Sequence, residues 1–553
     1  MKRILFCLFI CGILVSCSNS QTEQEKIDKE QEKSKKNVSK RDESITPANS
    51  YSDLFLDSSN LENFISEKKI PDSLASRMRS FYNARNYEFA WFSSDGLTEQ
   101  ARGFWNLHDY VNTYDPDSSL KDNALQKRMD NLITEEDLSI NGSDKIYINT
   151  ELTLTSHFIQ YILHNYEKGY VKRKEMERFI PSKKQDPLEV ADSLINKKHK
   201  DDKYFEDVNA SYKGLKDQLA RYAEIVKQGG WSPVTVPKKS FRKGITAPEI
   251  ALIKKRLQIS GDLAGGDTTQ VFNDSLEIAV KNFQLRHGYK PSGIISDSLV
   301  KDMNVPAITR LEQILMNMER MRWVATEPKG NLIVVNIPEF VMHVYEGKQK
   351  VFDIIVVVGK EGHNTMMFNG DLNQVVFSPY WNVPSSIVKN ELMPAMEKNS
   401  NYLARQNMEI TGNEGGLPVI RQKPGGKNAL GKVKFLFPNS FNIYFHDTPS
   451  KSLFEKDKRA YSHGCIRLKE PVKLAEYVLR NQPEWTPEKI SAAMDKGEQR
   501  FVKVKDPIPV VITYYTAWVD ENSQLNFRDD IYGHDGKLAG KMFGASKAIA
   551  ATK

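Results

Sequence analysis

The sequence predicts a multidomain α+β protein in which a helical region and a compact three-helix module precede a mainly β domain. The chain has 553 residues, 40% hydrophobic and 10% aromatic, which is enough for several cores. Apolar residues recur three and four positions apart through most of the first 320 residues, as in amphipathic helices. From Asn331 onward they alternate or run in blocks broken at Pro338, Gly347 and Gly359, which is typical of strands and hairpins.

The N-terminus, MKRILFCLFICGILVSC, has the pattern of an export signal. Lys2 and Arg3 precede an apolar run from Ile4 to Val15 that is too short to span a bilayer as a mature helix. The run ends in LVSC, which resembles the bacterial lipobox, where the cysteine is lipidated and becomes the first mature residue. We therefore expect residues 1–16 to be a lipoprotein signal peptide and Cys17 to carry the lipid; an ordinary secretory signal is the alternative. This predicts a lipid-anchored envelope protein whose folded body lies in the periplasm.

Residues 17–50 are expected to form a disordered tether. They are charged and almost free of apolar side chains, so they cannot bury enough surface to offset the entropy lost on ordering. The net charge of the whole chain, +7, is spread along it and forms no basic stripe. Together with export, this argues against nucleic acid as a partner.

Three helical segments follow the tether. Residues 51–240 are expected to form a helical scaffold domain, because ENFISEKKIPDSLASRMRSF and YKGLKDQLARYAEIVKQ space apolar residues three and four apart. Residues 241–306 should form a three-helix module whose apolar stripe comprises Ile253, Leu257, Leu276, Val280 and Phe283. Residues 307–330 contain an amphipathic connecting helix.

The mainly β domain is predicted for residues 331–537, with a C-terminal tail at 538–553. Its strand patterns include NLIVVNI, DIIVVVG, NQVVFSPYW and PIPVVITYY. Between them, residues 385–433 have short helical pieces and glycine-rich turns, and a segment this long beside a site is usually a lid or binding loop. A plain surface insertion is the alternative.

One cysteine stands alone in the body of the chain. Of four cysteines, Cys7 and Cys11 leave with the signal and Cys17 is used by lipid, so Cys465 in YSHGCIRLKEP has no disulfide partner. A thiol that attacks acyl carbons needs a nearby imidazole and N–H groups for the oxyanion. Gly464 permits a turn that presents such N–H groups, and two histidines are eligible: His463, two residues away, and His446, at the end of the strand pattern FNIYFH.

The segment HDTPSKSLFEKDKRAYSHGCIRL resembles the active-site segment of L,D-transpeptidases of the YkuD type. SPYWNVPSSI and PGGKNALGKVKFLFPN resemble flanking blocks of that family, and FYNARNYEFAWFSSDGLTEQA resembles the scaffold of its large, YcbB-like members. The three-helix module is similar to small peptidoglycan-binding domains in its Arg256-Leu257, Phe283-Gln284 and His287-Gly288 pairs. It has Ser292-Gly293 where Asp-Gly is usual, which leaves glycan binding open.

The resemblance implies a role for each matching residue. Cys465 would be the nucleophile, His446 the general base, Gly464 and Cys465 the oxyanion donors, and His463 a support. The substrate-contacting candidates are Ser462, Arg467, Tyr444 and Trp381. For Arg467 a structural ion pair is the favoured alternative.

The implied activity is peptidoglycan L,D-transpeptidation in cell wall biogenesis, with peptide stems as partners and 3-3 cross-links as products. Carbapenem-type β-lactams are the expected inhibitors, and no metal or organic cofactor is expected. The alternatives are an L,D-carboxypeptidase, attachment of stems to a protein amine, and a catalytically silent peptidoglycan-binding scaffold lipoprotein.

Overall fold

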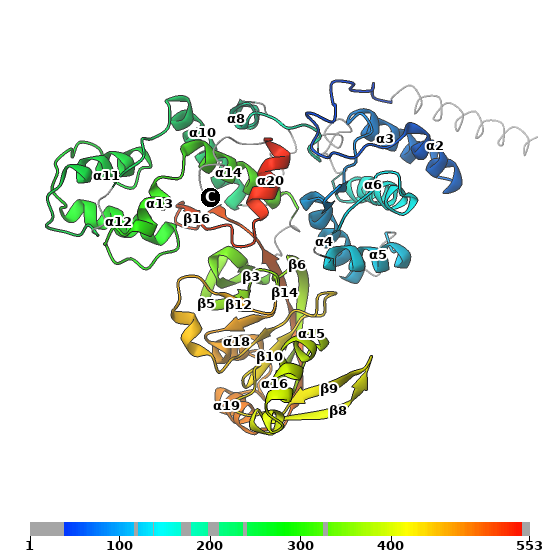
Figure 1. Ribbon diagram of the computed structural model, residues 1–553, viewed down its shortest axis with the longest axis vertical. Helices are drawn as coiled ribbons and strands as arrows, with labels where there is room; N and C mark the ends of the chain where they lie inside the picture. The colour runs from blue at the N-terminus through cyan, green and yellow to red at the C-terminus, as the bar shows by residue number, and fades with distance from the viewer. Residues whose placement is uncertain are drawn as a thin grey trace, which may run out of the picture. The chain divides into compact units, whose positions relative to one another are not determined.

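The computed structural model describes residues 38–114, 120–135, 138–166, 179–196, 210–235, 240–323 and 330–544. It confirms a multidomain α+β fold, with helical parts before a β-rich domain (Figure 1). The chain divides into two compact units, one ending at Gln185 and including Lys541–Gly544, the other covering Asp186–Gly540. No helix within the described ranges is both long and apolar enough to cross a membrane. The predicted signal and Cys17 lie outside the described residues.

The first unit is helical. Trp91 and Phe104 pack with Phe158 at ring-centroid distances of 5.3 and 5.5 Å, and all three are fully buried. A two-stranded hairpin lies among the helices. The described elements of the first unit are α2 (Ser58–Glu67), α3 (Asp72–Asn83), β1 (Phe92–Ser93), β2 (Gly96–Leu97), α4 (Glu99–Tyr114), α5 (Asn123–Thr134) and α6 (Lys145–Tyr166).

The predicted tether ends earlier than expected. Residues 38–50 belong to the folded unit: Ile45 is fully buried, and the Asp42 N–H donates to the Asn83 carbonyl at 2.9 Å. The prediction of disorder up to residue 50 is therefore wrong for this part. One buried apolar side chain and a few backbone hydrogen bonds dock this segment, although it is mostly polar in composition.

The predicted scaffold range, 51–240, does not form one body. Helices α8 (Pro187–Asn196) and α10 (Ala210–Lys227) belong to the second unit, where α10 packs against α14 (Ala307–Met321). Helix α10 buries Tyr212, Leu215, Leu219 and Tyr222. The periodicity of this helix indicated its apolar face correctly, but periodicity does not say which neighbour covers that face.

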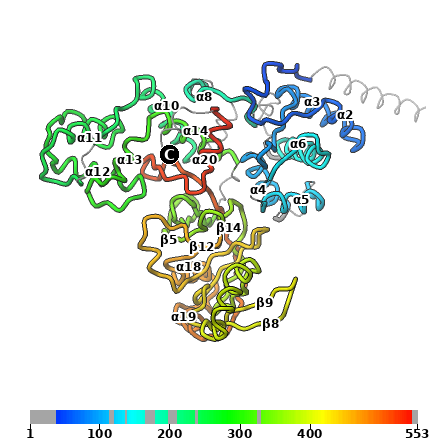
Figure 2. The backbone as a smooth tube through the Cα atoms, in the orientation of Figure 1, coloured from blue at the N-terminus to red at the C-terminus, as the bar shows by residue number. Residues whose placement is uncertain are grey.

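The three-helix module comprises α11 (Pro248–Ile259), α12 (Asp274–Arg286) and α13 (Asp297–Met303), which lie together in the backbone trace (Figure 2). Its core contains every residue of the predicted stripe, each fully buried. Asn273 and Ser296 cap α12 and α13 by accepting backbone N–H bonds.

Helix α14 connects the module to the β domain and is buried on all sides. The Gln313 side chain donates to the Thr516 and Arg528 carbonyls at 3.0 and 3.1 Å, and Asn317 donates to Thr516 Oγ1 at 2.8 Å. These acceptors flank the hairpin β15 (Ala517–Val519) and β16 (Leu525–Phe527). Helix α20 (His534–Met542) follows and crosses the predicted boundary at residue 537.

The β domain is built on a sheet that closes on itself. Its strand order is β12-β5-β13-β11-β10-β6-β14-β3-β4, and β4 also pairs with β5, which completes the circuit. The interior is a continuous apolar core that includes Val335, Val358, Phe435, Phe445 and Ile466. The strands are β3 (Asn331–Asn336), β4 (Val341–Glu346), β5 (Gln349–Gly359), β6 (Phe368–Phe377), β10 (Val433–Leu436), β11 (Phe445–His446), β12 (Ala460–Ser462), β13 (Ile466–Leu468) and β14 (Arg500–Thr513). Short 3-10 turns, Ile337–Glu339 and Lys451–Glu455, and helices α18 (Pro471–Val478) and α19 (Pro487–Asp495) join them.

Residues 385–433, here termed the capping segment, form a substructure beside the sheet. Helices α15 (Ser385–Ile387), η2 (Val388–Leu392), α16 (Met393–Lys398) and α17 (Tyr402–Arg405) precede strands β8 (Met408–Glu414) and β9 (Leu417–Gln422), and β7 (Trp381–Asn382) joins their sheet. The segment has its own small core of Val388, Leu392 and Ile420. Figure 1 shows β8 and β9 as a projecting hairpin next to α15 and α16.

Candidate active site

The parallel pairing of two short strands brings the predicted nucleophile and base to one face. In the pairing of β11 with β13, Phe445 lies opposite Ile466 and His446 opposite Arg467, and the Ile466 N–H donates to the Tyr444 carbonyl at 3.1 Å. Phe445 and Ile466 are fully buried in the barrel core. Because side chains alternate along a strand, Tyr444, His446, Cys465 and Arg467 share the opposite face.

Lys434 joins this face from the next strand. It pairs with His446 in the register of β10 with β11, and its Nζ lies 5.6 Å from the centroid of the Tyr444 ring. Two cations, Lys434 and Arg467, therefore flank the thiol and the imidazole. Burial lowers the pKa of both, while Cys465 acts in the opposite direction.

The Cys465 thiol is half-buried, and its Sγ points toward the Asn442 carbonyl oxygen at 3.8 Å. Burial raises its pKa, although hydrogen bonding with Tyr444 and the charges of Arg467 and Lys434 oppose this. The Cys465 N–H has no acceptor within the described part of the chain, so it is available to an incoming oxygen. At rest the group is a protonated thiol beside groups that stabilise its anion.

His446 is buried and held in one tautomer by its backbone. Its Nδ1 lies 2.5 Å from the Asp447 carbonyl, which can only accept, so Nδ1 carries the proton and Nε2 a lone pair. Burial, followed by the Arg467 charge, lowers the pKa of His446 to about 3. A neutral imidazole with a free Nε2 is the form that can take a proton.

The backbone that orients His446 is itself fixed. The Asp447 carboxylate accepts from the Lys432 N–H at 2.9 Å and from Lys451 Nζ at 2.6 Å. Gly431 permits this approach, because a Cβ there would lie 2.3 Å from the Asp447 carboxylate and its φ is +61°. The glycine-rich turn before β10 therefore helps to fix the backbone that orients His446.

His463 points away from the thiol. Its Nε2 lies 2.8 Å from Glu391 Oε1 in the capping segment, and its ring lies 4.8 Å from that of His363. This contact joins the loop that carries Cys465 to η2. The structure thus places His463 on a contact with the capping segment, and its role as a supporting residue stays a prediction.

The loop around Cys465 differs from the expectation in one respect. The Gly464 N–H donates to Ser462 Oγ at 3.2 Å, and Ser462 Oγ donates to the Cys465 carbonyl at 2.5 Å. The Gly464 N–H is thus occupied, and the prediction that it faces a substrate oxygen is wrong for this conformation. Ser462 was expected to contact substrate, but its side chain is buried and its hydroxyl forms hydrogen bonds within the loop.

The Gly464 carbonyl is fixed from the other side by residues that sequence reasoning missed. Thr365 Oγ1 donates to it at 2.7 Å and accepts from the Gly359 N–H at 2.9 Å. Tyr532 donates to the Gly359 carbonyl at 2.7 Å and accepts from the Thr365 N–H at 3.3 Å. No local motif marks Thr365 or Tyr532. The bond between Gly359 and Thr365 is local, but the others join residues that are at least 99 positions apart in the sequence.

The other two predicted substrate-contacting residues, Arg467 and Trp381, have different surroundings. Arg467 has no carboxylate partner among the described residues, and its buried Nε has no hydrogen-bond acceptor, so the favoured structural ion pair is not formed. Its cation is free for a substrate group. Trp381 instead pairs with Gln422 in the small sheet and packs on the core of the capping segment. The described residues contain no group of three or more His, Cys, Asp or Glu arranged to hold a metal ion.

Comparison with known proteins assigns three regions. Residues 330–512 match the family model "L,D-transpeptidase catalytic domain", residues 76–219 match "Scaffold domain", and residues 246–303 match "Putative peptidoglycan binding domain". A Haemophilus influenzae protein named "Putative L,D-transpeptidase" is 29% identical over 242 residues, which is 41% of this chain and 49% of that protein. The chain therefore matches about half the length of this relative.

Two solved structures are also similar. An L,D-transpeptidase from Mycobacterium smegmatis is 15% identical, with a TM-score of 0.19, over 33% of this chain and 58% of that one. One from Stackebrandtia nassauensis is 14% identical, with a TM-score of 0.20, over 44% and 91%. Because both scores are low, the assignment of the domains rests on the sequence matches.

Proposed function

Residues 330–512 are an L,D-transpeptidase catalytic domain of the YkuD type, and from this premise we propose that the chain forms 3-3 peptidoglycan cross-links through a Cys465 thioester. The observation that carries the proposal is the shared face of His446 and Cys465 across β11 and β13. The peptidoglycan-binding module beside the catalytic domain supports peptidoglycan as the partner.

The proposed first half-reaction is acylation. His446 Nε2 takes the thiol proton as the sulfur attacks the carbonyl carbon between the third and fourth residues of a tetrapeptide stem. The Cys465 N–H donates a hydrogen bond to the developing oxyanion, and the two cations, Lys434 and Arg467, offset the negative charge. The C–N bond then breaks, the His446 imidazolium returns its proton to the leaving amine, and a terminal D-amino acid departs.

The second half-reaction is transfer. An amine on another stem attacks the thioester carbonyl, His446 Nε2 takes the proton that this amine loses, and the sulfur leaves as a thiolate that is then reprotonated. His446 is neutral and has a lone pair on Nε2 for the proton in both halves, and its low pKa favours return of that proton to the leaving amine over its uptake. Water as acceptor would give an L,D-carboxypeptidase, and a protein amine would give an attached stem.

The decisive experiment incubates the purified chain with disaccharide-tetrapeptide and analyses both products and protein by mass spectrometry. We expect an adduct of one stem lacking its fourth residue on Cys465, and dimers linked between two third residues. Released tripeptide without dimer would assign the carboxypeptidase instead, and no adduct together with unchanged substrate would leave only the silent scaffold. Cys465→Ser is the matched blank.

We also propose that the protein is a lipoprotein of the bacterial envelope with its catalytic domain in the periplasm, on the strength of LVSC and the polar segment that follows it. Carbapenem-type β-lactams are the proposed inhibitors, because a strained cyclic amide offers Cys465 an acyl carbon in the same position as the stem carbonyl.

A further inference from the structure

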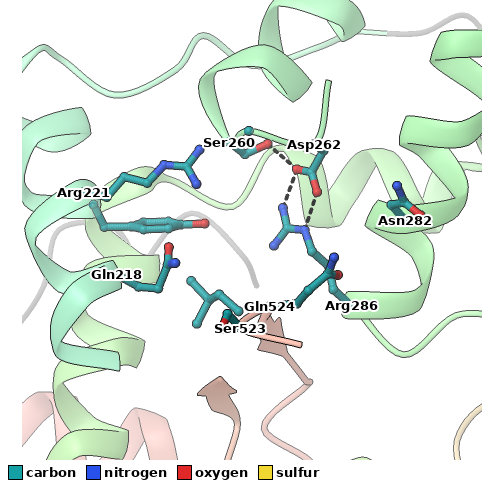
Figure 3. Close-up of a pocket in the computed structure, with 11 residues that line it drawn as sticks. Gln218, Arg221, Ser260, Asp262, Asn282, Arg286, Ser523 and Gln524 are labelled. Carbon is teal, nitrogen blue, oxygen red and sulfur yellow. Dashed lines mark hydrogen bonds and ion pairs between the residues drawn. The ribbon is translucent and has the colours of Figure 1, made fainter. Parts of the chain in front are cut away.

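The second unit has a polar pocket whose lining includes neither Cys465 nor His446. It is a cavity of about 190 Å³ between helix α10, the three-helix module and the turn of the β15–β16 hairpin. Figure 3 shows Gln218 and Arg221 on one side, Asn282 and Arg286 on the other, and Ser523 and Gln524 below. Segments up to about 300 residues apart in sequence therefore supply one lining.

One arginine of this pocket is already neutralised. Arg286 binds Asp262 through two bonds, Nε to Oδ1 at 2.5 Å and Nη2 to Oδ2 at 2.6 Å, and both side chains are buried. Ser260 Oγ donates to the same carboxylate at 2.5 Å. This ion pair forms a wall of the pocket with zero net charge.

The other arginine retains most of its hydrogen-bonding capacity. Arg221 donates only to the Ile259 carbonyl, at 3.2 Å, and has no carboxylate partner among the residues the structure describes. A guanidinium has five N–H donors. Gly261, with φ +75°, makes room for it, since a Cβ there would lie 2.2 Å from Arg221 Nη2. The backbone is thus shaped to admit this cation.

Three carboxamides complete the lining without partners of their own. Within the described chain, the side chains of Gln218, Asn282 and Gln524 make no hydrogen bond, yet each offers two donors and one acceptor oxygen. Carboxamides pair with the N–H and C=O groups of peptides, and a free guanidinium pairs with a carboxylate. The charge and the donor pattern together fit an anionic peptide rather than a neutral sugar.

From this geometry we propose that the pocket binds the carboxylate-bearing part of a peptidoglycan stem peptide, as an anchoring site separate from Cys465. The proposal rests on the proposed function for its choice of polymer. The volume is below the roughly 300–1,000 Å³ of sites that enclose a whole drug-sized ligand. One residue of a stem would therefore enter, while the rest of the polymer stays outside.

The test measures binding of disaccharide-tetrapeptide to the full chain carrying Cys465→Ala, by calorimetry, with Arg221→Gln added in one arm and Lys213→Gln in another. Lys213 lies exposed on the same helix and outside the pocket, so it matches the loss of charge. We expect Arg221→Gln to weaken binding about tenfold or more, because a charged hydrogen bond is lost, and Lys213→Gln to leave it unchanged. Asn282→Ala should weaken binding to a smaller extent.

Ligand arms identify the chemistry. Free tetrapeptide should retain the dependence on Arg221, whereas peptide with all its carboxylates amidated, and disaccharide whose lactyl carboxyl group is amidated, should lose it. Equal affinity of all arginine and lysine variants for the stem, or a dependence on Arg221 that the sugar alone reproduces, would overturn the proposal.

A last measurement separates this site from the catalytic one. In the chain with an intact Cys465, Arg221→Gln should be acylated by a carbapenem as fast as the unaltered protein. If no version is acylated, the proposed reaction fails while the pocket is still judged by its own binding data. If Arg221→Gln alone slows acylation, the pocket is not a separate site and the proposal falls.

Discussion

Thr365 Oγ1 donates a hydrogen bond to the carbonyl oxygen of Gly464 at 2.7 Å. That carbonyl belongs to the same peptide group as the Cys465 N–H, and in a trans peptide the two point in opposite directions. By holding the oxygen on the inner side, Thr365 turns the N–H toward the face where the substrate oxygen would lie. The threonine thus acts through the backbone, as a positioning residue.

Thr365→Val should slow acylation of Cys465 roughly 10- to 100-fold, because a misdirected oxyanion donor costs transition-state stabilisation. The measurement is kcat/KM for a stem substrate, together with alkylation of the thiol by iodoacetamide, which needs no oxyanion hole and should change little. Thr365→Ser keeps the hydroxyl and should restore most of the rate. A defect of equal size in Thr365→Ser, or in alkylation, would argue for a general loss of structure.

The two histidines should respond differently to pH. Removal of the base in His446→Ala should abolish acylation at neutral pH, with partial rescue at higher pH as the thiol ionises unaided. Because burial raises the pKa of Cys465, the rescue should begin above the ordinary thiol range of about 8.5.

His463→Ala should lower the rate without moving the pH profile, since His463 contacts Glu391 rather than the thiol. Carbapenem acylation, followed by intact mass over a pH series, measures both variants, with Cys465→Ser as the blank. A pH-rescuable defect in His463→Ala beside a normal His446→Ala would reverse the assignment of the base.

The capping segment should exchange backbone hydrogens faster than the barrel. Strand β8 is the outer strand of the small sheet, and Ile410 on it is 52% exposed, whereas Val510 and Ile512 of β14 are buried. Mass-resolved exchange should show faster labelling in residues 408–422 than in 508–513. Glu391→Gln should raise exchange in residues 385–398 and leave β14 unchanged. Exchange in the hairpin as slow as in β14 would contradict the prediction that the capping segment is a lid.

Stability should fall as pH rises above neutrality, because of His343. Although burial acts in the opposite direction, Glu339 at 3.1 Å and Asp353 at 2.7 Å raise the pKa of His343 to about 10. When the pKa of a histidine is higher in the folded than in the unfolded protein, its charge stabilises the fold. This stabilisation is complete at pH values below the unfolded-state pKa of about 6.5, and it is lost as the pH rises through the folded-state pKa of about 10.

His343→Gln should therefore lower the urea midpoint at pH 6 and differ little from the unaltered chain near pH 10. The comparison needs both proteins at both pH values, with a probe of the β domain such as its tryptophan fluorescence. An equal difference at the two pH values would show that the charge on His343 has no part in stability.

Cys17→Ala should release the protein from membranes. After detergent phase separation of whole cells, we expect the variant in the aqueous phase and the Cys465→Ser control in the detergent phase, because only the lipid supplies apolar affinity. A Cys17→Ala protein that still partitions with detergent would refute the lipid anchor.

Sequence patterns were most informative where the chemistry is local. The apolar stripe of the three-helix module and the alternation in β3, β10 and β14 follow from neighbouring residues, so periodicity predicts them. Residues His446 and Cys465 could be paired as candidates because both sit at strand ends in a recognisable segment. Ile45 escaped prediction because one buried residue in a polar stretch has no periodicity.

The parts that could not be predicted depend on the fold. The bond from Thr365 to Gly464 and those of Tyr532 depend on the closure of the sheet, which composition does not encode. The same holds for Arg467, whose expected ion pair required a carboxylate that the barrel does not bring to it. The Gly464 N–H was assigned to substrate from the motif alone, whereas Ser462, two residues earlier, takes it.

The position of β14 in the sheet has a consequence for the order in which the domain can fold. Strand β14 pairs with β6 on one side and with β3 on the other, although it is the last of the barrel strands to be synthesised. Until β14 is in place, β3 and β6 each keep an unpaired edge, and such edges attract other chains. Joining strands that are more than 120 residues apart is also slow. The unfolded chain therefore needs protection from aggregation until β14 docks, and any C-terminal truncation before Arg500 makes that exposure permanent.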